Sequence, residues 1–307
     1  MKFNQIDSDL LNTIASITEV PKGAVNIRKD GQPLIRMSSP NIIIKPKEDK
    51  PGIDVIVKPG TKNESVHIPV LVTQAGLQDL VYNTFEIGED ADVTIIAGCG
   101  IHNESHQDSG HDGIHEFIIK PKARVRYVEK HYGAGSGRGK KVLNPTTVVR
   151  IGSEAYAEME MVQIEGVDDT YRKTIAYVED KAHLKIVERL LTHRRQSAQS
   201  DIEISIEGKG GSAQILSRSV GKDESYQVFK ASMIGKTECT GHVECDSIIM
   251  GNAVIKAIPS LEAENSEAVL THEAAIGKIA GEQLIKLMSL GLTEEEAVNT
   301  IIEGFLR

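Results

Sequence analysis

The sequence has 307 residues, a formal net charge of −9, and 4 % aromatic residues with no tryptophan. The negative charge argues against a nucleic-acid surface, and the scarcity of aromatic side chains argues against a platform that stacks bases or sugars. There is no run of about 18 apolar residues and no apolar signal core near the N-terminus, which predicts a soluble, cytoplasmic protein without a membrane partner. Three cysteines, an odd and low number, are typical of free thiols in a reducing compartment.

The N-terminal residues predict a short helix, and short strands follow it. Asp7 or Ser8 can cap the helix, and Pro21 can end it. Its apolar face consists of Leu10, Leu11, Ile14, Ala15 and Ile17. From Val25 onward, runs rich in valine and isoleucine are interrupted by turn residues. We therefore expect an N-terminal helical segment at 1–24.

A repeat of turns and strands begins at about residue 85. Each unit has a turn residue, two polar residues and then a small residue that starts a strand. The small residues are Ala91, Ala123, Ala155, Ala182 and Ala213, separated by 32, 32, 27 and 31 residues. Such a unit, containing only strands and turns, is typical of stacked β coils. A β-sandwich has similar turn spacing, but the recurring small residue favours a solenoid. We expect this mainly β core to cover 25–271.

The C-terminal part, 272–307, predicts a pair of helices. The apolar stripe of the first consists of Ile276, Ile279, Leu284, Leu287 and Met288. Gly291 is a candidate C-cap for it. Thr293 and Glu296 form a capping box that opens the second helix. A helical pair in this place would cap the solenoid or dock a partner.

One segment, GCGIHNESHQDSGHDGIHEF, is rich in histidine. It contains Cys99, His102, His106, His111 and His115. The spacing of the histidines would suit a helical metal site, but Gly110 and Gly113 oppose a helix and favour strand–loop–strand. Imidazoles relay protons near neutral pH and a thiolate is a nucleophile, so a thiol with acid–base or metal-binding partners is one interpretation. A polar surface loop is the other.

The residues from Cys239 to Glu273 contain thiol, imidazole and carboxylate groups, the ligand types of iron and zinc. No CxxC pair is present, so a closed structural zinc site is not indicated. Cys245 and His272 are 27 residues apart, close to one repeat, so stacked coils would bring them together. Alternatively, Cys245 is an ordinary small buried residue.

Two further segments favour structural interpretations. HYGAGSGRGKK resembles a phosphate loop, but Ala134 stands where its first glycine belongs and Lys141 where serine or threonine belongs, so we expect a basic hairpin. The charged run containing His193, Arg194 and Arg195 predicts a solvated turn between strands.

Several motifs, in order, resemble the SufB/SufD family of scaffold subunits in SUF iron–sulfur cluster assembly. CDSIIMG (245–251), PSLEAEN (259–265), the segment 271–297 and IIEGF (301–305) resemble the end of that family. VTIIAGC followed by KARVRYVEKHYG resembles its middle. The resemblance covers residues 20–307 and is closest to the short single-subunit form of minimal systems, in which one scaffold protein works with one ATPase.

The resemblance implies a right-handed parallel β-helix and roles for five residues. Cys99 would accept sulfur, and His111 would line the sulfur path or relay protons. Cys245 would bind the nascent cluster. His272 and Glu273 would join it as ligands or proton handlers. Cys239 has no counterpart in this resemblance.

The resemblance also implies partners. A homodimer would share the cluster site, and a SufC-like ABC-type ATPase would dock on 282–290 and 294–304. A cysteine desulfurase or another donor would supply sulfur, and apo iron–sulfur proteins would receive a transient [2Fe–2S] or [4Fe–4S] cluster. Such a scaffold is not an enzyme. Two alternatives remain: a SufD-like structural subunit that binds the ATPase without building a cluster, and a metal-dependent enzyme that uses the histidine-rich segment.

Overall fold

The repeated turn found in the sequence lies at one corner of each coil of the chain. In the computed structural model, which describes residues 3–307, successive coils turn at residues with positive φ angles. These residues are Gly60, Asp90, Lys122, Glu154, Lys181 and Gly210. Each donates its backbone N–H to a carbonyl of the next coil; Asp90 N, for example, lies 3.2 Å from Pro121 O. The corners therefore stack on one another.

A small buried residue follows each of these corners. Ala91, Ala123, Ala155 and Ala182 take this position as predicted. The assignment of Ala213 is wrong, because the strand register pairs it with Leu184 and leaves Gly211 at the corner position. In the next coil the position belongs to Cys239, which pairs onward with Ala268. Cys239 is therefore a small buried residue of the repeat.

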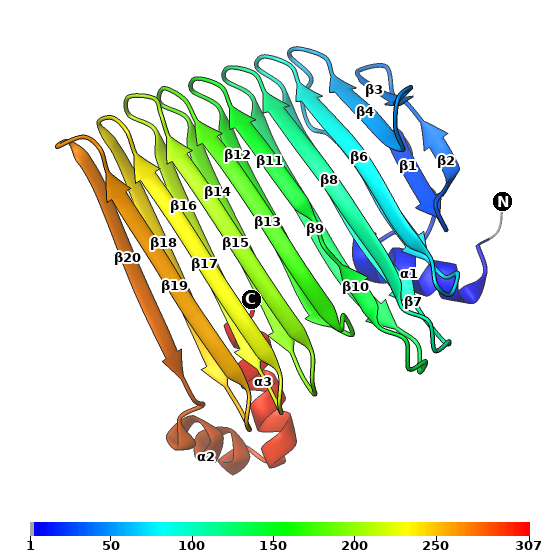
Figure 1. Ribbon diagram of the computed structural model, residues 1–307, viewed down its shortest axis with the longest axis vertical. Coiled ribbons are helices and arrows are strands. Elements are labelled where there is room, and N and C mark those ends of the chain that lie inside the picture. The colour runs from blue at the N-terminus through cyan, green and yellow to red at the C-terminus, as the bar shows by residue number, and fades with distance from the viewer. Residues whose placement is uncertain (1–2) are drawn as a thin grey trace.

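Two sheets, each with about one strand per coil, enclose the core (Figure 1). Sheet A contains, in spatial order, β2 (Gln32–Met37), β1 (Ala24–Lys29), β5 (Glu64–Val72), β7 (Asp92–His102), β9 (Arg124–Ala134), β12 (Tyr156–Glu165), β14 (His183–Thr192), β16 (Ser212–Gly221), β18 (Cys239–Ile249) and β20 (Ala268–Gly277). Sheet B contains β19 (Val254–Ala263), β17 (Tyr226–Gly235), β15 (Ser197–Ile206), β13 (Asp169–Val178), β10 (Lys141–Leu143), β8 (Ser109–Ile119), β6 (Gln78–Ile87), β4 (Gly52–Val57) and β3 (Ile42–Pro46), and β11 (Thr146–Ile151) pairs with β13 and β8.

The pairing within each sheet identifies the fold. Neighbouring strands pair in parallel, except for β1 with β2 and β3 with β4, which are antiparallel. Parallel stacking of successive coils excludes the β-sandwich alternative, whose sheets are antiparallel. The fold is a mainly β solenoid, as predicted, and it has about eight turns.

Helix α1 (Gln5–Ala15) lies on the outer face of sheet A. Its N-cap is Asn4, whose side chain accepts from Asp7 N, so neither Asp7 nor Ser8 caps it. It ends at Ser16, in the left-handed region, before Pro21 is reached.

Two glycines of β7 make room for this helix. A Cβ on Gly98 would lie 3.0 Å from Ile14 Cβ, and one on Gly100 would lie 3.0 Å from Leu10 Cδ2. The predicted apolar face of α1 is buried against these positions.

The C-terminal region differs from the prediction at its start. Residues 268–277 form strand β20, so Ile276 lies in a strand and not on a helical stripe. Helix α2 (Gly281–Ser289) has no buried residue, whereas α3 (Glu294–Phe305) buries Ile302 beside Val220. The predicted capping box of Thr293 and Glu296 is confirmed. No helix in the described residues 3–307 is long and apolar enough to span a membrane.

Candidate functional site

Cys99, on β7, contacts a small cavity between the two sheets. The cavity has a volume of about 20 Å³, and every residue that lines it is buried. Its polar lining consists of Asn83, Cys99, His111, His115, Glu129 and His131. Burial, together with the carboxylates of Asp79 and Glu129, raises the pKa of the Cys99 thiol well above its usual range. In the folded protein Cys99 is therefore a protonated, buried thiol.

His111, on β8, lines the same cavity, and a buried ion pair fixes its ring. Its Nδ1 lies 3.0 Å from Asp79 Oδ2, and Arg28 Nη2 lies 3.2 Å from Asp79 Oδ1. Burial by itself raises the pKa of Asp79, but the hydrogen bond and charge of His111 and the charge of Arg28 outweigh burial and lower it. Because an ionised carboxylate only accepts hydrogen bonds, His111 Nδ1 carries a hydrogen and donates it to Asp79, which leaves Nε2 as the ring nitrogen without a structural bond.

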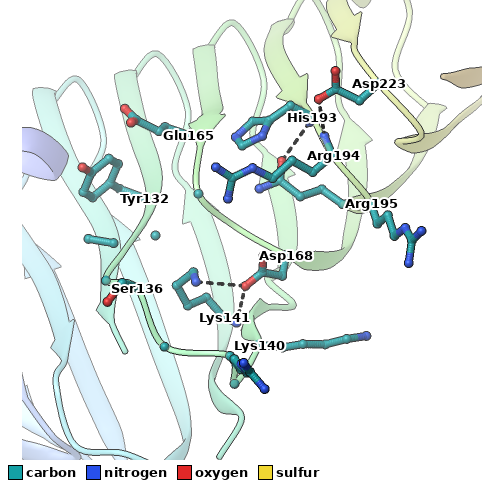
Figure 2. Close-up of a pocket in the computed structure, with 18 of the residues that line it drawn as sticks. Tyr132, Ser136, Lys140, Lys141, Glu165, Asp168, His193, Arg194, Arg195 and Asp223 are labelled. Carbon is teal, nitrogen blue, oxygen red and sulfur yellow. Dashed lines mark hydrogen bonds and ion pairs between the residues drawn. The ribbon is translucent and has the colours of Figure 1, made fainter. Parts of the chain in front are cut away.

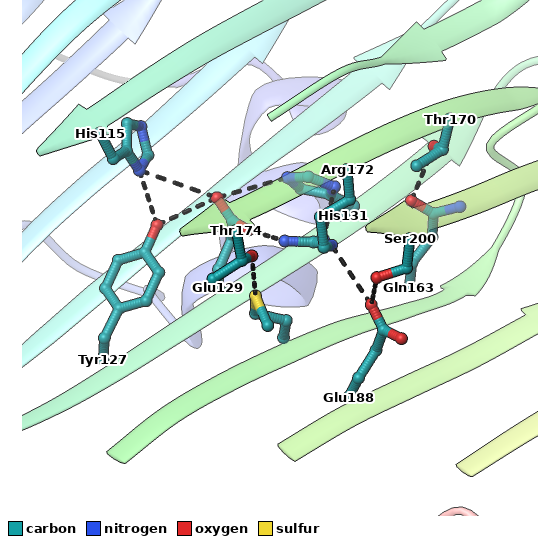
Figure 3. A network of polar contacts seen from close by, with 11 residues as sticks. His115, Tyr127, Glu129, His131, Gln163, Thr170, Arg172, Thr174, Glu188 and Ser200 are labelled. Carbon is teal, nitrogen blue, oxygen red and sulfur yellow. Dashed lines mark hydrogen bonds and ion pairs between the residues drawn. The ribbon is translucent and has the colours of Figure 1, made fainter. Parts of the chain in front are cut away.

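The His115 ring lies beside Tyr127, whose hydroxyl contacts Glu129 (Figure 3). Tyr127 Oη donates its single hydrogen to Glu129 Oε1 at 3.0 Å. His115 Nδ1, 2.8 Å from Tyr127 Oη, is therefore the donor in that pair. Burial lowers the pKa of His115 to about 4, so its ring is neutral near pH 7 and Nε2 is an acceptor. Both imidazoles thus use Nδ1 for structural bonds.

A guanidinium from sheet B bridges two carboxylates of sheet A (Figure 3). Arg172 Nη1, on β13, donates to Glu129 Oε2, and Arg172 Nε lies 3.7 Å from Glu188 Oε1. Burial by itself raises the pKa of both carboxyls. At Glu129 the nearby His131 and Arg172 outweigh burial and hold the pKa well below its usual range. At Glu188 burial prevails and raises the pKa.

These groups belong to a row of inward-facing positions that leads to Cys245. The register of sheet A aligns Ala97, Glu129, Met161, Glu188, Ser217, Cys245 and Ala274, which we call the inner ladder. Arg172 spans Met161 and connects Glu129 with Glu188, and Ser217 Oγ donates to Glu188 Oε2 at 3.3 Å. Neighbours in such a row are about 4.8 Å apart, so Cys245 follows directly after this polar chain.

The other predicted site residues lie at the C-terminal end of the solenoid. Strand β18 pairs with β20, so that Val243 is opposite His272 and Cys245 is opposite Ala274. Because side chains alternate between the faces of a strand, His272 shares the inner face with Cys245, whereas Glu273 lies on the outer face. Cys245 is buried, with Sγ 3.6 Å from the Glu273 backbone oxygen. The side chains of His272 and Glu273 are exposed.

One chain does not assemble these side chains into a ligand set. Among residues 3–307, no group of three or more His, Cys, Asp or Glu side chains is placed to hold a metal ion. Burial, followed by the carboxylates of Asp246 and Glu244, raises the pKa of the Cys245 thiol. The repeat length correctly predicted that Cys245 and His272 lie on neighbouring strands, but the register does not place these two residues opposite each other.

The histidine-rich segment is strand–loop–strand, as predicted: β7 ends at His102 and β8 begins at Ser109. His111 and His115 lie inside the solenoid, whereas His102 is half-buried, 3.3 Å from Glu104, and His106 is exposed. The four histidines are therefore divided between the interior and the surface, which gives no support to a metal-dependent enzyme on this segment.

A surface groove follows one corner of the solenoid (Figure 2). Its volume is about 1020 Å³, and it is lined by the glycine-rich residues 133–141 and the turn 193–196. The basic hairpin expected at 131–141 is wrong, because the strands on either side, β9 and β10, belong to different sheets. The turn expected at 193–195 is confirmed and lies between β14 and β15. Two basic side chains of the groove pair with acidic ones: Lys141 with Asp168 at 3.1 Å and Arg195 with Glu224 at 2.9 Å. No cysteine lines this groove.

Sequence reasoning missed most of the interior polar residues. They are Tyr127, Glu129, His131, Arg172, Glu188 and Ser217. A signal for those of sheet A was present, because inward positions recur every second residue after each repeated small residue. Arg172 has no such signal, since it belongs to the opposite sheet.

Known proteins are similar to this chain over most of its length. The family model described as SUF system FeS cluster assembly, SufBD core domain, matches residues 72–305. An iron–sulfur cluster assembly SufBD family protein of Methanothermobacter thermautotrophicus is 29 % identical over 259 residues, covering 83 % of this chain and 62 % of that protein. One of Archaeoglobus fulgidus is 29 % identical over 285 residues, covering 91 % and 73 %.

This chain covers a different share of the length of each relative. An iron–sulfur cluster assembly SufBD family protein of Methanocaldococcus jannaschii is 26 % identical over 292 residues, covering 93 % of this chain and 90 % of the relative. The chain spans only 62 % and 57 % of two Methanothermobacter relatives. Because the matched family domain covers more than half of the chain, the protein belongs to the SufBD family of iron–sulfur cluster assembly proteins.

Proposed function

We propose that this chain is a scaffold, not an enzyme, on which a transient iron–sulfur cluster is built and then passed to apo iron–sulfur proteins in the cytoplasm. The observation that carries the proposal is the buried polar row between Cys99 and Cys245. Charged side chains in the interior of a protein cost desolvation energy that their hydrogen bonds and ion pairs only partly offset, which favours a functional role for this row. Its position between two thiols supports a role in moving sulfur.

In this proposal Cys99 accepts sulfur as a persulfide from a cysteine desulfurase or another donor. His111 lines the start of the path or relays protons there, and the inner ladder leads onward to Cys245. The Thr147 hydroxyl supports a polar route, because it is buried without a hydrogen-bond partner and pairs in register with His115. Such unsatisfied groups are rare in folded proteins and are available to a polar species that passes.

We place the assembly site at the end of the solenoid, between two copies of the chain. Strands β19 and β20 end the two sheets, and exposed apolar side chains lie along them. These are Val254, Ile258, Val269 and Ile276, each 45–59 % exposed. An uncovered apolar edge favours pairing with another chain. A two-fold axis there would bring Cys245, His272 and Glu273 of both copies to one interface.

We assign the docking of a SufC-like ABC-type ATPase to the terminal helices. Helix α2 has no buried residue; its Ile285 is 68 % exposed, and Leu290, which caps its C-terminus, is 80 % exposed. Exposed apolar side chains on a helix of this kind are typical of a protein interface. ATP-driven movement of the partner would then open the interface between the two copies.

Anaerobic reconstitution with iron and sulfide, with and without the ATPase, tests this function. We expect wild-type protein to gain a labile visible chromophore that passes to apo-ferredoxin. Cys245→Ser should abolish the chromophore, because the thiolate is the soft ligand that favours iron. The matched control is Cys239→Ser, which alters a buried cysteine of the same strand at a corner position.

Iron content and visible absorption decide between the scaffold and its SufD-like alternative. If Cys245→Ser assembles a cluster as well as Cys239→Ser does, Cys245 is not a ligand. If wild type stays colourless even with its ATPase bound, the structural role, in which the subunit binds the ATPase but builds no cluster, replaces the scaffold role.

A further inference from the structure

The cavity beside Cys99 contains a space that exists because residue 113 is glycine. Gly113 lies on β8 between His111 and His115, on the same inward row. A Cβ at this position would lie 2.9 Å from His115 Nε2 and 3.4 Å from His111 Nε2. Both histidines are 6 % exposed, and both make their hydrogen bonds through Nδ1. Their Nε2 atoms are therefore left to face this space.

The chemistry of the lining defines what the space can bind. His115 Nε2 is a hydrogen-bond acceptor, by the tautomer derived above, so the ligand must carry a hydrogen. The cavity of about 20 Å³ has room for about one atom of the size of water. Cys99 lines the same cavity. A small S–H group bonded to Cys99 meets all three conditions.

We propose that this space receives the outer sulfur of a hydropersulfide on Cys99, and that His111 and His115 position it, with His115 Nε2 accepting its single hydrogen. The inference rests on the proposed role of Cys99 as sulfur acceptor. The sulfane sulfur of a donor R–S–SH passes to Cys99–SH, which gives R–SH and Cys99–S–SH. One S–S bond breaks and one forms, with no net oxidation. The two histidines are positioning residues, and the sulfur stays neutral, as a buried site favours.

Gly113→Ala tests the pocket without altering Cys99. The protein is incubated with cysteine hydropersulfide, alkylated, and the Cys99 peptide is examined by mass spectrometry for one added sulfur. Wild type should carry the sulfur, and Gly113→Ala should carry about tenfold less, because the methyl group fills the space between the imidazoles. Alkylation of the unfolded variant should still find a free Cys99 thiol.

Gly110→Ala is the matched control on the same strand. Its Cβ would meet Gln78 Oε1 at 2.3 Å, which is the end of an exposed, flexible side chain outside the cavity. It should load like wild type. A second variant, His115→Asn, keeps an amide near the Nδ1 position for Tyr127 and removes Nε2. It should load several-fold less, because one acceptor is lost.

The outcomes of these experiments distinguish a failure of the pocket inference from a failure of the proposed role of Cys99 as sulfur acceptor. If wild type gains no sulfur on Cys99, the acceptor role fails and the pocket inference fails with it. If wild type, Gly113→Ala and His115→Asn gain sulfur equally, the acceptor role stands and the pocket inference is overturned. Should Gly113→Ala fail to fold, as judged by circular dichroism, His115→Asn alone decides: loading equal to wild type overturns the inference.

Discussion

The two carboxylates around Arg172 have different environments. Glu129 accepts directly from Nη1, whereas the Arg172 Nε atom is 3.7 Å from Glu188. Glu188 also accepts hydrogen bonds from Ser200 and Ser217, at 2.7 and 3.3 Å. One buried cation balances one ionised carboxylate, and a second ionised carboxylate would remain uncompensated. The raised pKa of Glu188 and the lowered pKa of Glu129 follow from this arrangement.

Amide substitutions should separate the two residues by their effect on stability. Glu129→Gln leaves the Arg172 cation buried without its ionised partner, so the free energy of unfolding should fall by about 3–5 kcal/mol. Glu188→Gln replaces a carboxyl that tends to keep its proton with an amide of the same shape, and should change that free energy by less than about 1 kcal/mol. Urea denaturation at pH 7 measures both values. Equal losses would mean that both carboxylates are ionised in the folded protein.

The pH dependence of unfolding gives an independent test. The folded-state pKa of Glu129 lies below its ordinary value of 4.5, so its stabilisation is present above that value and is lost as the pH falls. The folded-state pKa of Glu188 lies above 4.5, so the unfolded chain releases this proton first as the pH rises. Wild type should therefore lose stability relative to Glu188→Gln as the pH rises from 4.5. A difference that does not vary with pH, in urea denaturation across this range, would contradict the raised pKa.

Within a single strand, the sequence predicts well which side chains face the interior of the solenoid. The alternation of side chains, counted from Ala123, places Tyr127, Glu129 and His131 inside the solenoid, and counted from Ala182 it places Glu188 there. The structure confirms all of these positions as buried. The inner ladder was therefore predictable strand by strand. The alignment of one strand with the next depends on the register between coils. Because the length of the coils varies, the spacing in the sequence does not predict that register.

Two elements differ from the sequence-based prediction for physical reasons. Ala213 has the right residue type for a corner, but Gly211 occupies that position, because the glycine-rich corner shifts the register by two residues. The predicted helical segment 272–307 overlaps the last residues of strand β20, because Ile276 and Ile279 fit a helical stripe. A strand at the open end of a solenoid has no buried face to impose a period of two, so its alternation is weak.

The corner positions of the coils predict how substitutions there affect stability. Cys239→Ala should cost less than about 1 kcal/mol, since alanine occupies this position in several other coils. Ala182→Val adds bulk at a fully buried corner and should cost about 1–3 kcal/mol. Chemical denaturation measures both. Cluster reconstitution should be unchanged by Cys239→Ala; its loss would show that Cys239 belongs to the cluster site and not only to the repeat.

The whole molecule is a solenoid whose two ends differ. At the N-terminal end both sheets finish in antiparallel strands, β2 and β3, which stop the stacking of coils. At the C-terminal end β19 and β20 remain parallel additions to the stack, and most of their residues are exposed. Stacked-coil proteins need a terminal cap to stay soluble. The repeat predicted the solenoid, but only the exposure of its last strands shows that one end is open.

Two lysine substitutions should separate the surface for a second copy from the surface for the ATPase. Ile276, on β20, is 46 % exposed, and Ile285, on α2, is 68 % exposed. Charged residues on an edge strand oppose pairing with another strand, so Ile276→Lys should be monomeric in sedimentation velocity while it still binds the ATPase. Ile285→Lys should remain dimeric and bind the ATPase about tenfold more weakly. Variants that both behave like wild type would exclude these two surfaces as interfaces.

The monomeric variant also tests where the cluster ligands come from. Cys245 and His272 share an inner face in one chain, but Glu273 lies on the outer face. If the ligand set is completed by a second copy, Ile276→Lys should assemble little cluster although Cys245 is intact, and Ile285→Lys should assemble it normally from iron and sulfide without the ATPase. Iron content after anaerobic reconstitution distinguishes these outcomes. A monomer that still binds a full cluster would show that a single chain rearranges β20 to bring its own ligands together, and the open end would then need another explanation.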